Sequence, residues 1–158
     1  MKKFFCKEVR GKMAKILVVY HSQSGNTEEM AKAVVEGAKR VSGTEIILKK
    51  ALEATLEDLV SSSGVAIGSP DYFSYMAGAV KDFFDRTFYP SQGKVTGKPC
   101  VLFVSGGGGG KPALNSLKRI CESFKFKQIG EVAAAGKPSP GVIAECEKLG
   151  EKLAEAVK

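Results

Sequence analysis

Apolar runs alternate along the chain with stretches that are apolar on one side only. Runs rich in Val, Ile, Leu and Ala predict strands at residues 15–20, 44–49, 64–68, 99–105 and 129–135. After four of these strands, apolar residues recur every three or four positions, as on the buried face of a helix. One such face holds Met30, Ala33, Val34, Gly37, Ala38 and Val41. Residues 52–60 predict one shorter amphipathic helix.

This alternation predicts a doubly wound α/β fold. Strands that are apolar throughout are buried on both faces, and short strand–helix repeats imply a parallel sheet with right-handed crossovers. We therefore expect a five-stranded parallel sheet with helices on both faces. In such sheets ligands bind beyond the carboxyl ends of the strands, where the strand order reverses. The loops after the first, third and fourth strands are accordingly the candidate site.

The loop after the first strand has the chemistry of a phosphate site. Residues 21–27 read HSQSGNT and lead directly into a predicted helix, whose first-turn N–H groups lack internal partners. The segment contains no Lys or Arg, so a phosphate would be held by backbone amides and by neutral side chains, namely Ser22, Ser24, Asn26 and Thr27. This favours a compact monophosphate over a nucleoside triphosphate. The alternative is an ordinary capped turn, because Ser, Asn and Thr are also common N-cap residues.

The loop after the third strand carries three aromatic residues and a methionine within residues 68–76. Aromatic rings stack on flat heterocycles, and a loop beside the phosphate turn is well placed to hold one. Tyr72 and Phe73 are the candidates for this stacking. Met76 is expected to fold inward as part of the core.

The loop after the fourth strand contains five consecutive glycines, residues 106–110. Glycine loses the most backbone freedom on ordering, so the tract indicates close approach of the backbone to a ligand. A flexible linker is the competing interpretation, but it suits a strand–helix connection inside a compact domain poorly. The tract matches neither common nucleotide motif, since Ser105 and Pro112 break a Walker A loop and positions 111 and 112 lack the last glycine of a dinucleotide fingerprint. Lys111 is expected to be a solvated residue at the start of a helix.

Composition narrows the class of protein. The chain has 158 residues, 44% hydrophobic and 26% charged, which fits one domain. The net charge is +7, of which residues 1–12 carry +4, so we expect a basic N-terminal extension before a single domain at 13–158. The other basic residues are scattered, and we expect no nucleic-acid binding. No apolar run is long enough to span a membrane. Four cysteines without CxxC spacing and a single histidine argue against zinc or disulfides and favour reduced thiols in the cytoplasm.

In this order on a strand–helix repeat, the three loops resemble those of the flavodoxin-like family of FMN proteins, over residues 14–157. The S-x-S-G-N-T run resembles the family's phosphate loop, and the GSP-x-x-F pattern resembles the loop around the isoalloxazine. The strand followed by glycines resembles the third flavin loop. The resemblance implies strand order 2-1-3-4-5, FMN as cofactor and electron transfer as function. It implies these cofactor-binding residues: Ser22, Gln23, Ser24, Gly25, Asn26, Thr27, Ser69, Pro70, Asp71, Tyr72, Phe73, Ser105, Gly106, Gly107 and Gly108. No side chain is predicted to be catalytic.

Departures from the family leave alternatives open. Flavodoxins that shuttle electrons are typically acidic, usually carry an aromatic in the third loop and commonly have a glycine in the second. This chain is basic, has no aromatic between Ser105 and Leu117, and has no glycine between Ser69 and Ala77. One flavin face would then be open, as in flavodoxin-like NAD(P)H:quinone oxidoreductases. The partner is therefore a redox protein or, in the alternative, NAD(P)H and a quinone, with a homo-oligomer completing the substrate pocket.

Two other classes of protein are alternatives to an FMN protein. A phosphorylatable receiver domain shares the strand order and would use Asp71, but it needs acidic metal ligands at the end of the first strand, where Tyr20 and His21 stand. A small binding module without flavin would have no phosphate to hold. Both interpretations fit the three loops less well than an FMN protein does.

Overall fold

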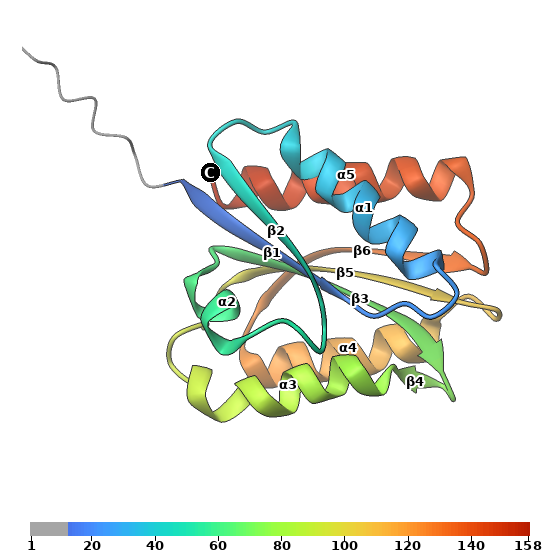
Figure 1. The fold of residues 1–158 in the computed structure, drawn as a ribbon, viewed down its shortest axis with the longest axis horizontal. Coiled ribbons are helices and arrows are strands. Elements are labelled where there is room, and N and C mark those ends of the chain that lie inside the picture. Colours follow the sequence, from blue (N-terminus) through green and yellow to red (C-terminus); the bar gives the residue numbers. More distant parts are fainter. Residues whose placement is uncertain (1–12) are drawn as a thin grey trace, which may run out of the picture.

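Five parallel strands form the central sheet (Figure 1). The computed structural model describes residues 13–158, so the predicted basic extension at 1–12 lies outside the described residues. The sheet has the spatial order β2-β1-β3-β5-β6. Its strands are β1 (Ala14–Tyr20), β2 (Thr44–Lys50), β3 (Gly64–Tyr72), β5 (Pro99–Gly106) and β6 (Lys127–Ala135). Counted along the chain without the short β4, this order is 2-1-3-4-5, so the predicted topology is confirmed. The order reverses between β1 and β3.

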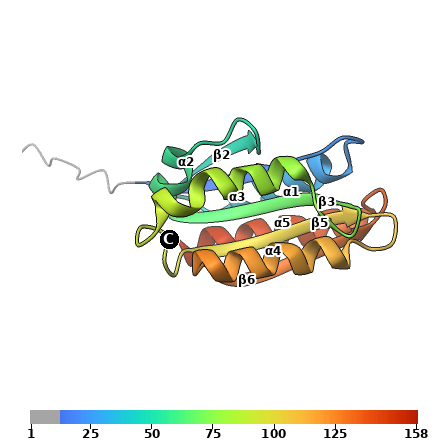
Figure 2. The same ribbon diagram turned by 90° about the horizontal axis from the view of Figure 1, so that it is seen from below.

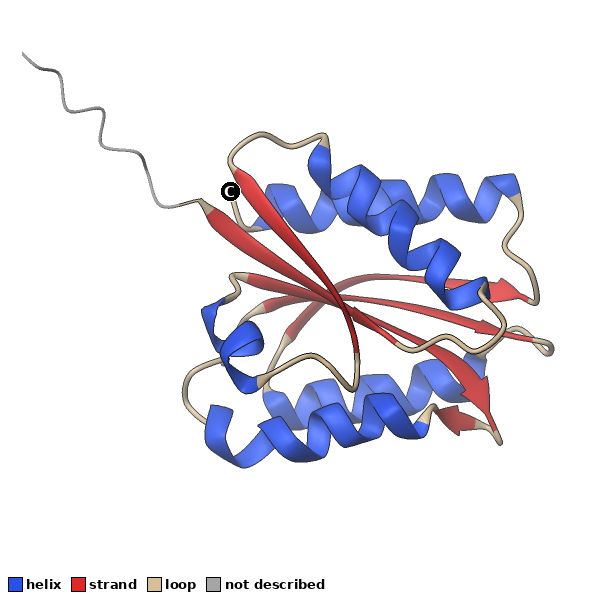
Figure 3. Ribbon diagram, viewed as in Figure 1, coloured by secondary structure: helices blue, strands red, loops and turns tan. Residues whose placement is uncertain are grey.

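Helices cover both faces of the sheet (Figures 2 and 3). One layer holds α1 (Asn26–Lys39) and α5 (Pro140–Ala156). The other holds α2 (Leu56–Ser61), α3 (Gly78–Ser91) and α4 (Lys111–Phe124). Side chains of β1 alternate between the two cores: Ile16 and Val18 pack toward α1 and α5, whereas Leu17 and Val19 pack toward the opposite layer. All four are fully buried, as the apolar run in this strand predicts. The predicted short helix at 52–60 begins later, at Leu56, because Thr55 caps it through a reciprocal pair of hydrogen bonds with Asp58.

The third strand is longer than predicted. The sequence predicts a strand at 64–68 followed by a loop, but β3 continues to Tyr72 and turns back into β4 (Tyr75–Met76). The Gly-Ser-Pro-Asp segment has turn-forming residues, which explains the wrong boundary. Pairing with β5 as far as Pro70 and with β4 at Asp71 overrides that local tendency. Most of the candidate aromatic loop is therefore an ordered hairpin.

Helices α1 and α5 cross at two glycines. A Cβ atom on Gly37 would overlap the carbonyl oxygen of Glu147, and one on Gly150 would overlap the carbonyl oxygen of Val34. Beside this crossing, the Arg40 guanidinium donates to the carboxylates of Glu147 at 2.8 Å and Glu151 at 3.1 Å. The backbones thus approach more closely than any residue with a side chain permits.

The ends of the described chain and the three candidate loops lie at opposite ends of the strands. Because the helices run antiparallel to the strands, β1 begins and α5 ends at the amino edge (Figure 1). Met13 and Val157 line one hollow there. The loops that follow β1, β3 and β5 lie at the carboxyl edge. Within residues 13–158, no helix is both long and apolar enough to cross a membrane.

Candidate functional site

The structure brings the three predicted loops together at the carboxyl edge. The His21 N–H donates to the Gly68 carbonyl at 3.2 Å, which joins the first loop to β3. The hydroxyls of Thr27 and Ser105 share a buried hydrogen bond of 2.8 Å, which joins the first loop to the third. The candidate residues around these contacts thus form one cluster, as predicted.

The first loop ends in a helix that no side chain caps. Its N-cap residue is Gly25, with φ 98°, and the Gly25 N–H donates to the Ser22 hydroxyl at 3.1 Å. The first hydrogen bond of the helix runs from Glu29 N–H to the Gly25 carbonyl at 3.0 Å. The N–H groups of residues 26–28 consequently have no protein acceptor within the part of the chain that the structure describes. The ordinary capped turn is therefore not what forms here.

The polar side chains of this loop differ in exposure. Gln23 and Ser24 are exposed, and Asn26 is half-buried. Thr27 is only 1% exposed, and its hydroxyl is engaged with Ser105, so it offers an anion its backbone N–H. Ser24 makes no side-chain hydrogen bond with any residue of the described range, which leaves its hydroxyl available.

Ser69 shapes the second loop through its buried side chain. Its hydroxyl accepts from the Ala77 N–H at 2.8 Å and donates to the Pro70 carbonyl at 2.7 Å, and the residue is 0% exposed. The side chain therefore braces the hairpin, and only the backbone of this residue can line a ligand.

The aromatic candidates of the second loop lie in different environments. The half-buried Tyr72 ring meets His21 edge to face, with 5.9 Å between ring centroids, and burial raises the pKa of its phenol. Phe73 is fully exposed at the tip of the hairpin, and Met76 is buried, as predicted. Phe73 and Ser74 have φ values of 55° and 61°, in the left-handed region that favours glycine. The missing glycine noted in the sequence is thus replaced by two residues that hold a strained turn.

Asp71 contacts both the second and the third loop. Its Oδ1 accepts from the Ser74 N–H at 2.9 Å, and its Oδ2 accepts from the Ala113 N–H of α4 at 3.0 Å. Beside it lies a hollow of about 270 Å³, lined by Asp71, Ser74, Gly107, Gly108, Gly110 and Pro112. Sequence reasoning missed Ser74, Gly110 and Pro112. The strained turn and the start of α4 bring them here, and neither is marked by a motif.

The glycine loop is an ordered turn. The Gly106 carbonyl accepts from the N–H groups of Gly109 at 3.0 Å and Gly136 at 2.9 Å. A Cβ atom on Gly106 would lie 2.9 Å from the Asp71 Cβ, and Gly109 and Gly110 have positive φ. Gly107 and Gly108 instead face open space. The linker interpretation is therefore wrong, and Lys111 is the exposed first residue of α4, as predicted.

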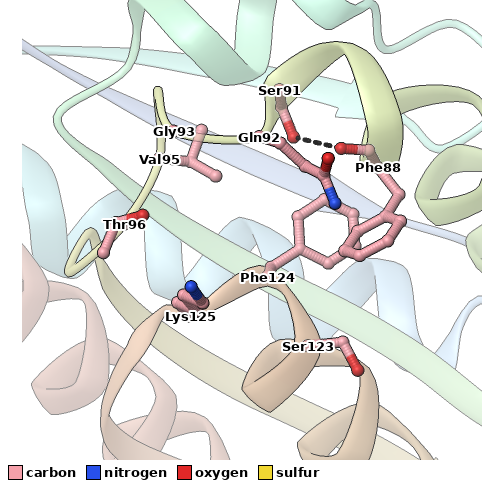
Figure 4. Close-up of a pocket in the computed structure, with 9 residues that line it drawn as sticks. All are labelled: Phe88, Ser91, Gln92, Gly93, Val95, Thr96, Ser123, Phe124 and Lys125. Carbon is pink, nitrogen blue, oxygen red and sulfur yellow. Dashed lines mark hydrogen bonds between the residues drawn. The ribbon is translucent and has the colours of Figure 1, made fainter.

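Two larger cavities lie between α3 and α4. One has a volume of about 320 Å³ and an aromatic wall of Phe88 and Phe124 (Figure 4). Its Ser91 hydroxyl already donates to the Phe88 carbonyl at 3.1 Å, and Lys125 is the one charged side chain among its described lining residues. A neighbouring groove of about 470 Å³ shares Phe88, Ser123 and Phe124 with it. None of the three candidate loops contributes to either cavity.

Among residues 13–158, there is no side-chain cluster for metal binding and no disulfide. No three His, Cys, Asp or Glu side chains there are arranged to hold a metal ion, so the acidic cluster of a receiver domain is not found in that range. Cys100, Cys121 and Cys146 are free and buried, and Cys6 lies outside the described residues. Burial raises the pKa of the Cys146 thiol to about 12.

The fold and the three loops define a doubly wound α/β protein with an uncapped helix N-terminus at its switch point. The sequence profile of the family described as Flavodoxin matches residues 18–150. A flavodoxin of Aquifex aeolicus (strain VF5) is 35% identical over 162 aligned positions, which cover 92% of this chain and 88% of the relative. The chain belongs to the flavodoxin family. It is thus an FMN-binding electron-transfer protein.

Solved structures agree with this assignment. An archaeal flavodoxin superposes with a TM-score of 0.80 at 27% identity, covering 90% of this chain and 98% of the other. The two-electron reduced flavodoxin of Megasphaera elsdenii superposes with a TM-score of 0.76 at 28% identity, covering 89% and 98%. Both neighbours are covered almost completely, so the match extends over the whole flavodoxin unit.

Proposed function

We propose that Ser22–Thr27 hold the phosphate of FMN. The observation that carries this assignment is the first turn of α1, where the N-cap has no side chain and the amides of residues 26–28 have no protein acceptor within 13–158. A phosphate dianion supplies the missing acceptors and sits at the positive end of the helix dipole. The neutral hydroxyl of Ser24 adds a donor, so no lysine or arginine is required.

The hairpin and the glycine loop fit the rest of FMN. They flank the hollow of about 270 Å³. Neither a positive φ nor a crowded Cβ explains the glycines at 107 and 108, but the close approach of a flat ring would. We assign residues 69–73 and 105–108 to the ring and the ribityl chain, with Tyr72 or Phe73 stacking on one face of the ring. When bound, the FMN ring supplies the redox chemistry, and the protein sets its position and exposure.

We propose that the protein carries electrons between redox partner proteins. The relatives at 27–35% identity are flavodoxins whose length matches this chain, which favours the carrier over an NAD(P)H-dependent FMN/quinone oxidoreductase. The third loop offers no aromatic between Ser105 and Leu117, so one face of the ring stays open toward a partner. The proposed partner is a redox protein, and the proposed location is the cytoplasm. A homo-oligomer is part of the oxidoreductase alternative, in which it would complete the substrate pocket.

An anaerobic titration of the FMN-loaded protein tests the carrier proposal. NADPH and NADH are expected to leave the visible spectrum of the oxidised flavin unchanged over minutes, and dithionite is expected to bleach it. Rapid bleaching by either nicotinamide would contradict the carrier and favour the oxidoreductase. Failure of the protein to take up FMN would contradict the assigned residues themselves.

Replacing Ser24 by alanine is expected to weaken FMN binding about tenfold, because a hydrogen bond to a charged group contributes about 1.5–3 kcal/mol. Riboflavin has no phosphate, so its affinity should stay unchanged. Fluorescence-quenching titrations with both ligands measure the difference. Ser123→Ala, at the far end of α4, is the control and should bind both as the parent does. An equal loss of FMN and riboflavin affinity in Ser24→Ala would remove this residue from the phosphate site.

A further inference from the structure

The carboxylate of Asp71 caps a helix that lies 42 residues further along the chain. Helix α4 has Gly110 as its N-cap, which offers no side chain, and its second residue is Pro112, which has no N–H. The next N–H group, that of Ala113, donates to Asp71 Oδ2 at 3.0 Å. A carboxylate at this position also interacts favourably with the positive end of the helix dipole. The acceptor that the glycine loop cannot provide thus comes from the second loop.

The other oxygen of the same carboxylate holds the hairpin. Asp71 Oδ1 accepts from the Ser74 N–H at 2.9 Å, across the turn in which Phe73 and Ser74 adopt positive φ. Neither residue is glycine, so the turn needs support from its surroundings. The hydrogen bond from the Ser74 N–H to Asp71 is one of the contacts that stabilise this turn.

The backbone of the third loop lies directly against Asp71. A side chain on Gly106 would approach the Asp71 Cβ to 2.9 Å, so the two loops touch without space for adjustment. The hollow of about 270 Å³ opens between them and includes Asp71 among its lining residues. The Oδ2 bond of Asp71 joins the hairpin to the start of α4, and the Oδ1 bond fixes the turn of the hairpin. A second bond between the hairpin and α4 runs from the Met76 N–H to the Ser116 hydroxyl at 3.0 Å. Asp71 is thus the contact that lies closest to the hollow among those that set the separation of the hairpin from the glycine loop.

We propose that Asp71 is a positioning residue that sets the width of the slot for the flavin ring before the cofactor binds. The inference rests on the proposed FMN site. An amide at this position offers one acceptor oxygen instead of two, and its NH₂ group would face one of the two backbone N–H donors. The hairpin and the glycine loop would then be held less firmly beside the hollow, although pairing of β3 with β5 and the Met76–Ser116 hydrogen bond remain. The phosphate loop would keep its donors.

Binding of riboflavin tests the proposal, because riboflavin occupies the ring slot without using the phosphate loop. Asp71→Asn is expected to weaken riboflavin about tenfold, or about 1.4 kcal/mol, and to weaken FMN by the same factor. Asp71→Ser provides a second variant, since its hydroxyl reaches the turn but not α4; it should show the same loss. Asp58→Asn is the matched control, because Asp58 also accepts from a backbone N–H, that of Thr55, at 2.9 Å. It should lower the thermal midpoint while leaving both affinities unchanged.

Hydrogen exchange in the cofactor-free protein provides a second readout. The Ala113 amide should exchange slowly in the parent and in Asp58→Asn, and about tenfold faster in Asp71→Ser, whose hydroxyl does not reach α4. In Asp71→Asn, either the Ala113 or the Ser74 amide should exchange faster, because one acceptor oxygen remains for the two donors. Riboflavin affinity equal to that of the parent in both Asp71 variants, or an equal loss in Asp58→Asn, would overturn the inference. A parent protein that binds neither FMN nor riboflavin would instead contradict the proposed function.

Discussion

Replacing Gly37 by alanine is expected to lower the free energy of unfolding by about 1–3 kcal/mol, the range in which overpacked sites typically fall. The added Cβ overlaps the carbonyl oxygen of Glu147, which belongs to the backbone of α5 and cannot rotate away. Separating the helices would also disturb the close contact at Gly150. Alanine favours a helix by up to about 1 kcal/mol over glycine, so the clash must exceed that gain to destabilise the protein.

Urea denaturation of the cofactor-free protein measures this effect. Gly78→Ala is the control, because Gly78 begins α3, has no positive φ and has open space where its Cβ would be. Its free energy of unfolding should stay within about 1 kcal/mol of the parent value. A Gly37→Ala protein as stable as Gly78→Ala would show that α1 and α5 separate at little cost.

Replacing Lys98 by methionine is expected to lower the free energy of unfolding by about 1–3 kcal/mol at pH 7, the cost of an unpaired buried polar group. Lys98 is 8% exposed, and its ammonium donates to the carbonyls of Leu59 and Ser62 at the end of α2. Methionine keeps the aliphatic packing, but it leaves the Ser62 carbonyl without a donor from the described residues. Lys94→Met, at an exposed position nearby, is the control and should be neutral.

The pH dependence of the stability difference between the parent and Lys98→Met gives an independent check. Burial lowers the pKa of Lys98 to about 8, from an ordinary value of 10.5. Between these two values the unfolded chain binds more protons at this position than the folded protein does, so the contribution of Lys98 to stability rises with pH. The free energy of unfolding of the parent relative to Lys98→Met should increase from pH 8 to pH 10.5. A flat difference across that range would show that Lys98 keeps its ordinary pKa.

Local pattern was enough to predict the parallel sheet and the buried faces of its helices, whereas the strand order came from the resemblance to the flavodoxin-like family. The alternation of apolar residues and the loop after β1 are properties of short segments, which a single sequence displays directly. The boundary of β3 was wrong because Ser69 and Pro70 have turn propensity, and pairing with β5 decides their conformation. Gly37 was correctly placed on a buried face, but its closeness to α5 depends on a residue about 110 positions away.

The contacts inside the candidate site were the least predictable. Thr27 was predicted as a phosphate ligand by its type, and nothing local indicates that its hydroxyl is engaged with Ser105. The bond from Ala113 to Asp71 joins two loops that are each unremarkable in this respect. Such pairs become visible only once the sheet has placed the carboxyl ends of β1, β3 and β5 side by side.

Both ends of the folded unit lie at the amino edge of the sheet, where Met13 and Val157 line the same hollow. A linker attached to either end therefore leaves from the side opposite the three loops. The protein can be joined to another domain, or fixed to an electrode surface, through either end while the carboxyl edge with its three loops faces outward. Such attachment would raise the effective concentration of a tethered redox partner and leave the proposed flavin site accessible.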